Sequence, residues 1–183
     1  FDEMKKLCEQ KSGTFIYASN YSIGVNIFFE LNKKLAMLMA NRNDYHPAIE
    51  EIHHTAKKDA PSGTAITLAE QIIENIPSKT QWVNDAQAKE DEINITSKRN
   101  DPAPGTHHVK YHSAIDDIEI IHTAHNRKGF ATGAVLAAPA FLGGCHQDGE
   151  VKPGTIFFNL SHEEFANKTY FLTGGGKTYR LTK

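Results

Sequence analysis

Apolar residues recur every three to four positions over residues 23–40, which is the spacing of an amphipathic helix. The recurring residues are Ile23, Ile27, Leu31, Leu35 and Leu38, with Val25, Phe28 and Met39 widening the same face. Ser22 precedes them at a position from which its side chain can cap the first turn. The pattern predicts a long helix whose Ile/Leu/Met row packs into a core or an interface and has no cofactor role.

Two further helices are predicted, over residues 63–76, between a Ser62 cap and Pro77, and over the Ala-rich residues 130–142. Residues 2–11 are charged and permit a helix. Short apolar or alternating runs predict strands, namely 14–18, 46–53, 92–98, 106–111 and 115–122, with a further candidate at 155–158. The strands 106–111 and 115–122 are close enough to form a hairpin, whereas residues 78–90 form a polar connection.

This order of strands and helices predicts an α+β fold, an open mixed β-sheet with helices packed on one face. A complete parallel Rossmann sheet needs more βα units and a Gly-rich first turn, and the chain contains no G-x-G-x-x-G.

Length, composition and charge narrow the class of protein. The 183 residues correspond to one domain or slightly more, and 39% of them are hydrophobic, which excludes a disordered chain. With a net charge of -2, the chain has no excess of positive charge for binding nucleic acid or an anionic membrane. No apolar run approaches the length of a membrane span. Two cysteines far apart, Cys8 and Cys145, are typical of reduced thiols, so we expect a cytoplasmic protein.

Most of the candidate catalytic and ligand-binding residues lie in the stretch from Glu51 to Ala65. It holds two imidazoles (His53 and His54), the ammonium of Lys57 and the carboxylate of Asp59, followed by the Ser-Gly-Thr start of a helix. Helix N-termini bind carboxylate or phosphate groups, and a neighbouring histidine or lysine can protonate what the anion carries. For any single residue, a capped helix after a polar loop is the simpler interpretation, but the density of the whole cluster favours an anion site.

A metal site is not expected. His107, His108 and His112 suggest zinc, but on a strand His108 and His112 share one face while His107 points to the other. No neighbouring carboxylate or cysteine completes a tetrahedral set. His122, at the end of an apolar strand, is interpreted as a core or interface histidine.

The stretch from Glu51 to Ala65 closely resembles the signature of the dihydrodipicolinate reductases, also called 4-hydroxy-tetrahydrodipicolinate reductases. Their pattern Glu-x-His-His-x-x-Lys-x-Asp-Ala-Pro-Ser-Gly-Thr-Ala is matched at every fixed position. Residues 18–26, 104–107, 118–124 and 127–134 are also similar to family segments. The resemblance covers residues 1–144, about four-fifths of the chain.

The resemblance implies an NADPH- or NADH-dependent oxidoreductase of diaminopimelate and lysine biosynthesis. Such an enzyme transfers hydride to a cyclic pyridine-type dicarboxylate and forms tetrahydrodipicolinate. By motif position, His53 would be the general acid/base, Lys57 the proton donor, and Asp59 an orienting or loop-fixing residue. The substrate carboxylates would be held by His54, Gly63 and Thr64. The coenzyme would be contacted by Ala18, Ser19, Asn20 and Tyr21, and flanked by Arg127 and Phe130.

The same resemblance implies a domain division and an assembly. Residues 1–21 correspond to the last helix and strand of a truncated Rossmann coenzyme domain, whose Gly-rich part is missing from the sequence. Residues 22–144 correspond to the substrate-binding and oligomerisation domain, which implies a homotetramer. Residues 145–183 match nothing in the family and form an atypical tail of unknown role.

Two other functions remain open from the sequence. The chain could be a non-catalytic fragment that only binds a dicarboxylate or oligomerises, because the coenzyme-binding half is missing. A weaker alternative is a His-rich metal hydrolase, which a chelator would inactivate.

Overall fold

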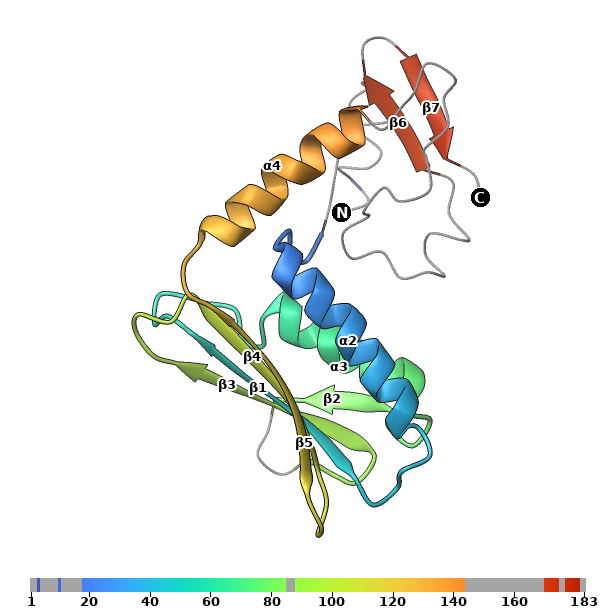
Figure 1. Cartoon of the computed structure of the whole chain (residues 1–183), viewed down its shortest axis with the longest axis vertical. Coiled ribbons are helices and arrows are strands. Elements are labelled where there is room, and N and C mark those ends of the chain that lie inside the picture. Colours follow the sequence, from blue (N-terminus) through green and yellow to red (C-terminus); the bar gives the residue numbers. More distant parts are fainter. Residues whose placement is uncertain are drawn as a thin grey trace. The chain divides into compact units, whose positions relative to one another are not determined.

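The computed structural model describes residues 18–84, 88–143, 170–174 and 177–181, together with Glu3 and Gln10, both helical. The chain divides into two compact units, one of residues Ser22–Phe130 and one that combines Phe1–Tyr21 with Ala131–Lys183. The first unit contains the sheet and the two helices that position the candidate site (Figure 1).

Five strands of the first unit form one mixed sheet in the order β2-β3-β1-β4-β5. Their bounds are β1 His46–His53, β2 Gln81–Val83, β3 Glu92–Arg99, β4 Gly105–His112 and β5 Asp117–Ala124. The central strand β1 runs parallel to β3 and antiparallel to β4. Helices α2 (Ile23–Met39) and α3 (Gly63–Asn75) lie together on one face of this sheet (Figure 1). The predicted α+β fold, an open mixed sheet with helices on one face, is confirmed.

The core lies between this sheet face and the helices. Alternate residues of β1 and β4 are buried, so Ile49 and Val109 face the helices while their strand neighbours face the opposite side of the sheet. From the helices, Phe28, Leu68 and Ile72 complete the apolar layer. The same alternation carries Glu51, His53 and His107 to the helix-covered face, where all three are buried.

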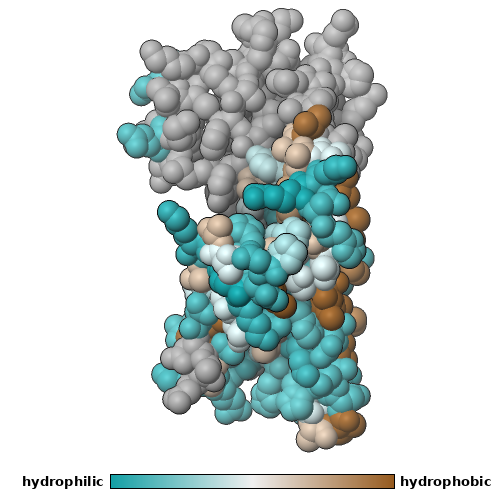
Figure 2. Space-filling view, turned by 90° about the vertical axis from the view of Figure 1, so that its left-hand side faces the viewer, coloured by the Kyte–Doolittle hydropathy of each residue, from teal (hydrophilic) through white to brown (hydrophobic). Residues whose placement is uncertain are grey.

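Most of the α2 row singled out in the sequence does not pack into the core of this unit, so the interface alternative for that row stays a prediction. Ile27, Leu31 and Leu38 are 58%, 51% and 75% exposed, whereas the buried residues of α2 are Val25, Phe28, Phe29, Asn32, Ala36 and Met39. Figure 2 shows apolar surface running along one side of the molecule next to largely hydrophilic surface. Helix α2 therefore has apolar residues on two sides, and the periodicity of the sequence favoured the side that carries Ile27, Leu31 and Leu38.

A polar contact accompanies the burial of the other row. The side-chain amide of Asn32 donates hydrogen bonds to the Leu68 carbonyl and to Oε1 of Gln71, both at 3.0 Å. These bonds join α2 to α3 on the side where Val25, Phe28 and Phe29 are buried.

The remaining elements differ from the predictions in detail. Strand β2 lies within the segment expected to be a polar connection, because pairing with β3 stabilises three residues that show little pattern of their own. Helix α4 (Lys128–Gly143) begins two residues earlier than expected. Residues 2–11, 14–17 and 155–158 lie outside the described residues apart from Glu3 and Gln10.

In the second unit, strands β6 (Tyr170–Gly174) and β7 (Lys177–Leu181) pair as an antiparallel hairpin that the sequence analysis did not anticipate. Among the described residues, no helix combines the length and the apolar character needed to cross a membrane.

Candidate active site

The candidate site forms where β1 ends and α3 begins. The parallel pairing of β1 with β3 places His53 opposite Arg99, and the antiparallel pairing with β4 places Glu51 opposite His107. The loop after His53 leads directly to Ser62, the N-cap of α3. Side chains from three strands and from the helix start therefore meet at one place, although they come from widely separated parts of the sequence.

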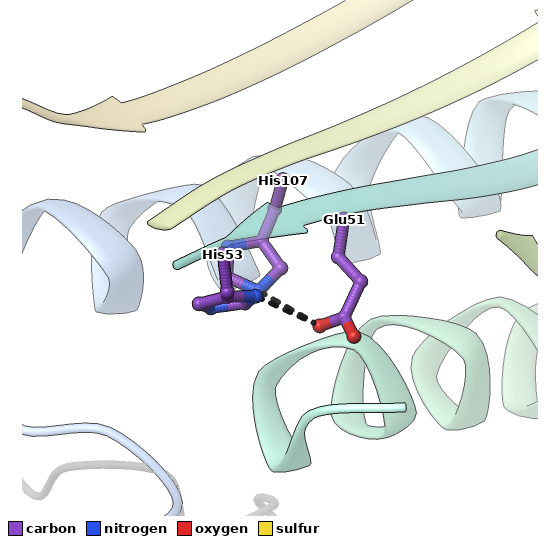
Figure 3. Close-up of side chains that lie close together, drawn as sticks. All are labelled: Glu51, His53 and His107. Carbon is purple, nitrogen blue, oxygen red and sulfur yellow. Dashed lines mark ion pairs between the residues drawn. The ribbon is translucent and has the colours of Figure 1, made fainter. Parts of the chain in front are cut away.

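Glu51 is at the centre of this group, with a fully buried side chain. Its two carboxylate oxygens accept the backbone N–H of Ser62 at 3.1 Å each, and Oε1 lies 3.4 Å from both Nη1 and Nη2 of Arg99. Its Oε2 lies 3.4 Å from Nδ1 of His53 and 3.8 Å from Nε2 of His107 (Figure 3). A buried carboxylate needs such compensation, because an unpaired buried charge is costly.

Arg99 also holds the loop between β1 and α3. Its Nε and Nη2 donate hydrogen bonds to the carbonyl oxygens of Lys57 at 3.3 Å and Asp59 at 2.6 Å. On the other side of the loop, the Asp101 carboxylate accepts the Thr55 backbone N–H and hydroxyl. The hydrogen bonds from Thr55 lower the pKa of Asp101, and the nearby His54 acts in the same direction.

Lys57 and Asp59 form an ion pair within this loop. The Lys57 ammonium lies 2.9 and 2.8 Å from the two carboxylate oxygens of Asp59. The hydrogen bonds from Lys57 lower the pKa of the Asp59 carboxyl group. Only 21% of the Lys57 side chain is exposed, compared with 60% for Asp59, so the ammonium stays at the edge of the buried cluster.

The N-terminus of α3 completes the site. The Ser62 hydroxyl accepts the Ala65 backbone N–H at 3.2 Å and lies 3.2 Å from Nε2 of His107. Gly63 and Thr64 open the helix, Gly63 exposed and Thr64 buried. The positive end of the helix dipole therefore lies beside Lys57 and His53, an arrangement that favours an anion.

The inward-facing histidines are electrically neutral near pH 7. Burial lowers the pKa of His53, and the negative charge of Glu51 offsets part of this effect. Burial also lowers the pKa of His107, to about 3, and that of His122. A neutral histidine has one ring nitrogen that accepts a proton and one that donates, which suits His53 for acid–base chemistry.

The structure brings together six of the residues singled out in the sequence, namely His53, His54, Lys57, Asp59, Gly63 and Thr64. Of the predicted coenzyme contacts, Arg127 is exposed and Phe130 packs against the core. Ala18, Ser19, Asn20 and Tyr21 belong to the second unit. The roles assigned to all of these residues stay predictions.

Three residues of the site were missed as participants by sequence reasoning, namely Glu51, Arg99 and His107. Glu51 had a readable signal, since strand alternation places it on the same face as Ile49 and His53. Arg99 and His107 come from other strands, so their contacts with Glu51 depend on the sheet register.

The ligand atoms of Glu51, His53 and His107 lie within 4.8 Å of one another, a spacing that a bound cation would also require. Both oxygens of Glu51 already accept N–H groups, and Arg99 supplies the compensating positive charge. Hydrogen bonding accounts for this donor set, and no metal-dependent step follows from it.

The prediction that no carboxylate lies near the histidines of β4 is wrong. Glu119 of β5 lies 3.3 Å from His108, and Asp117 of β5 lies 2.6 Å from His112.

A mixed sheet covered on one face, with histidine, lysine and carboxylate groups gathered at a helix start, defines an α+β domain suited to binding a small anion. The chain belongs to the dihydrodipicolinate reductase family, since the family model described as "Dihydrodipicolinate reductase, C-terminus" matches residues 24–154.

Curated relatives support this assignment. The 4-hydroxy-tetrahydrodipicolinate reductase of Christiangramia forsetii is 55% identical over 138 residues, 75% of this chain and 57% of the relative. The protein of the same name from Methanococcoides burtonii is 41% identical over 131 residues, 70% of this chain and 49% of the relative. The chain therefore spans about half the length of the curated relatives it matches.

A solved structure also resembles the chain. The dipicolinate-bound dihydrodipicolinate reductase from Paenisporosarcina sp. TG-14 has a TM-score of 0.50 and 28% sequence identity. The match covers 74% of this chain and 54% of that structure.

Proposed function

We propose that this chain is the substrate-binding and proton-donating part of a 4-hydroxy-tetrahydrodipicolinate reductase of the diaminopimelate and lysine pathway. The observation that carries the proposal is the juxtaposition of His53, the Lys57–Asp59 ion pair and the N-terminus of α3. A dicarboxylate requires a cation and helix N–H donors, and its reduction requires a proton source. The family membership and the names of the relatives support the same reaction.

In this proposal the first carboxylate of the substrate binds at Gly63 and Thr64, and His54 helps to hold the dicarboxylate. Lys57 supplies the proton that accompanies reduction, and the ion pair with Asp59 directs its ammonium. His53 serves as the general acid/base, because it is neutral and lies 8% exposed at the edge of the buried cluster. Arg99 keeps the Lys57 loop in place.

The coenzyme of the proposed reaction is NADPH or NADH, which supplies hydride when bound. The described residues fit one end of such a molecule, because Ser22 and Gly129, the starts of α2 and α4, lie side by side and the exposed cation Arg127 is adjacent. Ala18 to Tyr21, immediately before α2, would contact the coenzyme. A cytoplasmic location is part of the proposal, and the sparse use of cysteine, at Cys8 and Cys145, supports it.

Calorimetric titration of the chain with pyridine-2,6-dicarboxylate in the presence of excess NADPH tests the proposal. We expect saturable binding with one site per chain. Absence of binding would contradict the proposed substrate site and favour the non-catalytic alternative, a fragment that only oligomerises. Binding without turnover would support a chain that binds the dicarboxylate but does not reduce it.

A matched pair of variants locates the binding. Lys57→Ala should weaken binding of pyridine-2,6-dicarboxylate about tenfold or more, because it removes the cation beside the helix start, and it should leave the fold intact. Lys58→Ala, which removes the exposed neighbouring charge, should have little effect. Equal effects of the two variants would move the anion site away from Lys57.

We also propose a homotetramer that assembles through the sheet face opposite α2 and α3. No helix among the described residues of the Ser22–Phe130 unit covers this face (Figure 1), and it carries the 57% exposed Ile121 beside the ion pairs of Lys110. Ile121→Glu should shift the sedimentation of the chain from tetramer to monomer. An unchanged sedimentation coefficient would place the interface elsewhere.

A further inference from the structure

Glu51 is the only carboxylate, among the described residues, within ion-pair distance of Nδ1 of His53, with its Oε2 3.4 Å away. No hydrogen-bond partner satisfies that nitrogen within the part of the chain that the structure describes. A protonated Nδ1 is attracted to the carboxylate, whereas an unprotonated Nδ1 would direct its lone pair at a negative charge. The contact therefore distinguishes between the two neutral forms of the imidazole ring.

The other ring nitrogen faces a different element. Nε2 of His53 points toward Gly105, the first residue of β4, where an added Cβ would lie only 3.2 Å from it. Gly105 has a positive φ of 156°, so this position favours glycine on backbone grounds too. The ring is thus held between a carboxylate at Nδ1 and a glycine that leaves room beside Nε2.

Several contacts fix the position of the Glu51 carboxylate. The backbone N–H of Ser62 binds both oxygens, and Arg99 lies against Oε1, which leaves Oε2 directed at the histidines (Figure 3). Arg99 also donates hydrogen bonds to the carbonyl oxygens of Lys57 and Asp59 in the loop. Glu51 and Arg99 therefore connect His53 with Lys57, the two residues proposed to transfer protons.

We propose that Glu51 is a positioning residue that keeps His53 in the tautomer with hydrogen on Nδ1, so that Nε2 is the nitrogen that accepts and returns a proton. The catalytic meaning of this assignment rests on the proposed role of His53 as general acid/base. The tautomer itself is a property of the chain and is measurable without substrate or turnover.

The test is nitrogen NMR of the chain labelled with ¹⁵N-histidine, recorded above the pKa of the imidazole, with His53 assigned by its loss in His53→Gln. We expect a protonated-type shift for Nδ1 of His53 and an unprotonated-type shift for Nε2. A protonated Nε2 and an unprotonated Nδ1 in the unmodified chain would overturn the proposal, whatever the behaviour of any variant.

The variant Glu51→Gln tests the cause. Its amide can turn an N–H toward Nδ1, so His53 should change to the Nε2–H form or to a mixture, while the remaining histidine signals show a folded chain. Glu50→Gln is the matched control, since Glu50 lies on the opposite sheet face and pairs with Lys98. A folded Glu51→Gln chain that retains the original tautomer would show that Glu51 does not set it.

The same spectra followed against pH add a second readout. The charged groups facing His53 are Glu51 and Asp59, which raise its pKa, and Lys57 and Arg99, which lower it. Glu51→Gln should therefore shift the His53 midpoint downward, whereas Glu50→Gln should not. Because pyridine-2,6-dicarboxylate binding is measured separately, failure of the proposed function and failure of this positioning role are distinguishable.

Discussion

The Nη2 atom of Arg99 donates a 2.6 Å hydrogen bond to the carbonyl oxygen of Asp59, so strand β3 holds the loop that carries Lys57. The same guanidinium lies 3.4 Å from the buried Glu51. One side chain from β3 therefore supports both the loop and the carboxylate beside His53, although Arg99 is far from both in sequence.

Arg99→Met should lower the free energy of unfolding by about 2–3 kcal/mol, because it leaves the buried Glu51 charge without its cation and the loop carbonyls without a donor. Urea denaturation measures the change. The control is Lys98→Met, which removes the neighbouring charge from a partly exposed pair with Glu50 and should cost less than about 1 kcal/mol. A similar loss of stability in both variants would show that the contacts of Arg99 with Glu51 and the loop contribute no more than an exposed ion pair.

Thr64→Val should reduce the affinity for pyridine-2,6-dicarboxylate about tenfold, equivalent to about 1.4 kcal/mol, because it replaces the hydroxyl at the start of α3 without changing the side-chain volume. Calorimetry measures the affinity. Thr67→Val changes a threonine one turn later, whose hydroxyl donates to the Gly63 carbonyl, and should leave binding nearly unchanged. If Thr67→Val weakens binding as much as Thr64→Val, the anion does not lie at the first turn.

Acid should destabilise the fold through His107. Its pKa is about 3 in the folded chain, compared with 6.5 for an ordinary histidine, because the ring is buried. Between these values the unfolded chain binds the proton that the folded chain does not, so stability falls as the pH is lowered. From about pH 7 to about pH 5 the loss is about 2 kcal/mol for this residue, and His53 and His122 act in the same direction.

Thermal unfolding at a series of pH values measures this dependence. His107→Gln should flatten it over that pH interval, even if the variant is less stable throughout. His46→Gln, at the exposed start of β1, should leave the slope as it is. An unchanged slope in His107→Gln would assign the acid sensitivity to other groups.

Gly105→Ala should destabilise the chain by about 1–3 kcal/mol and move the His53 ring, because the new methyl group meets Nε2 and the backbone φ disfavours alanine. Denaturant titration and the His53 NMR signals report the two effects. The control is Gly129→Ala in α4, where the added Cβ would make an ordinary 3.6 Å contact with Ser22 Oγ. That variant should be neutral or stabilising by up to about 1 kcal/mol.

Local chemistry was predictable from the sequence because the groups involved are neighbours in it. The Ser62 cap and the helix that follows are confirmed, and the Lys57–Asp59 ion pair lies in the same short stretch. The anion-binding role of this loop stays a prediction. Strand alternation places His107 and His108 on opposite faces, as the structure confirms. Backbone geometry and capping act over a few residues, so a short stretch of sequence contains the information.

The composition of the buried cluster depended on tertiary structure. Glu51 meets Arg99 and His107 only because β1 lies between β3 and β4 in one particular register. A shift of one residue would turn these side chains to the other face of the sheet. Register is set by the whole sheet and its packing, so the partners of Glu51 could not be read from its neighbours in the chain.

Helix α2 shows the same division. Its sequence determined that residues 23–39 form a helix starting at Ser22, since periodicity and capping are local properties. Which side is buried depends on packing against α3 and the sheet, where Val25, Phe28 and Ala36 enter the core and Asn32 bonds to Leu68 and Gln71, while Ile27, Leu31 and Leu38 stay exposed. The sequence by itself determined the long helices and the four longer strands of the sheet, while packing between elements decided which faces meet, because that choice depends on contacts between distant residues.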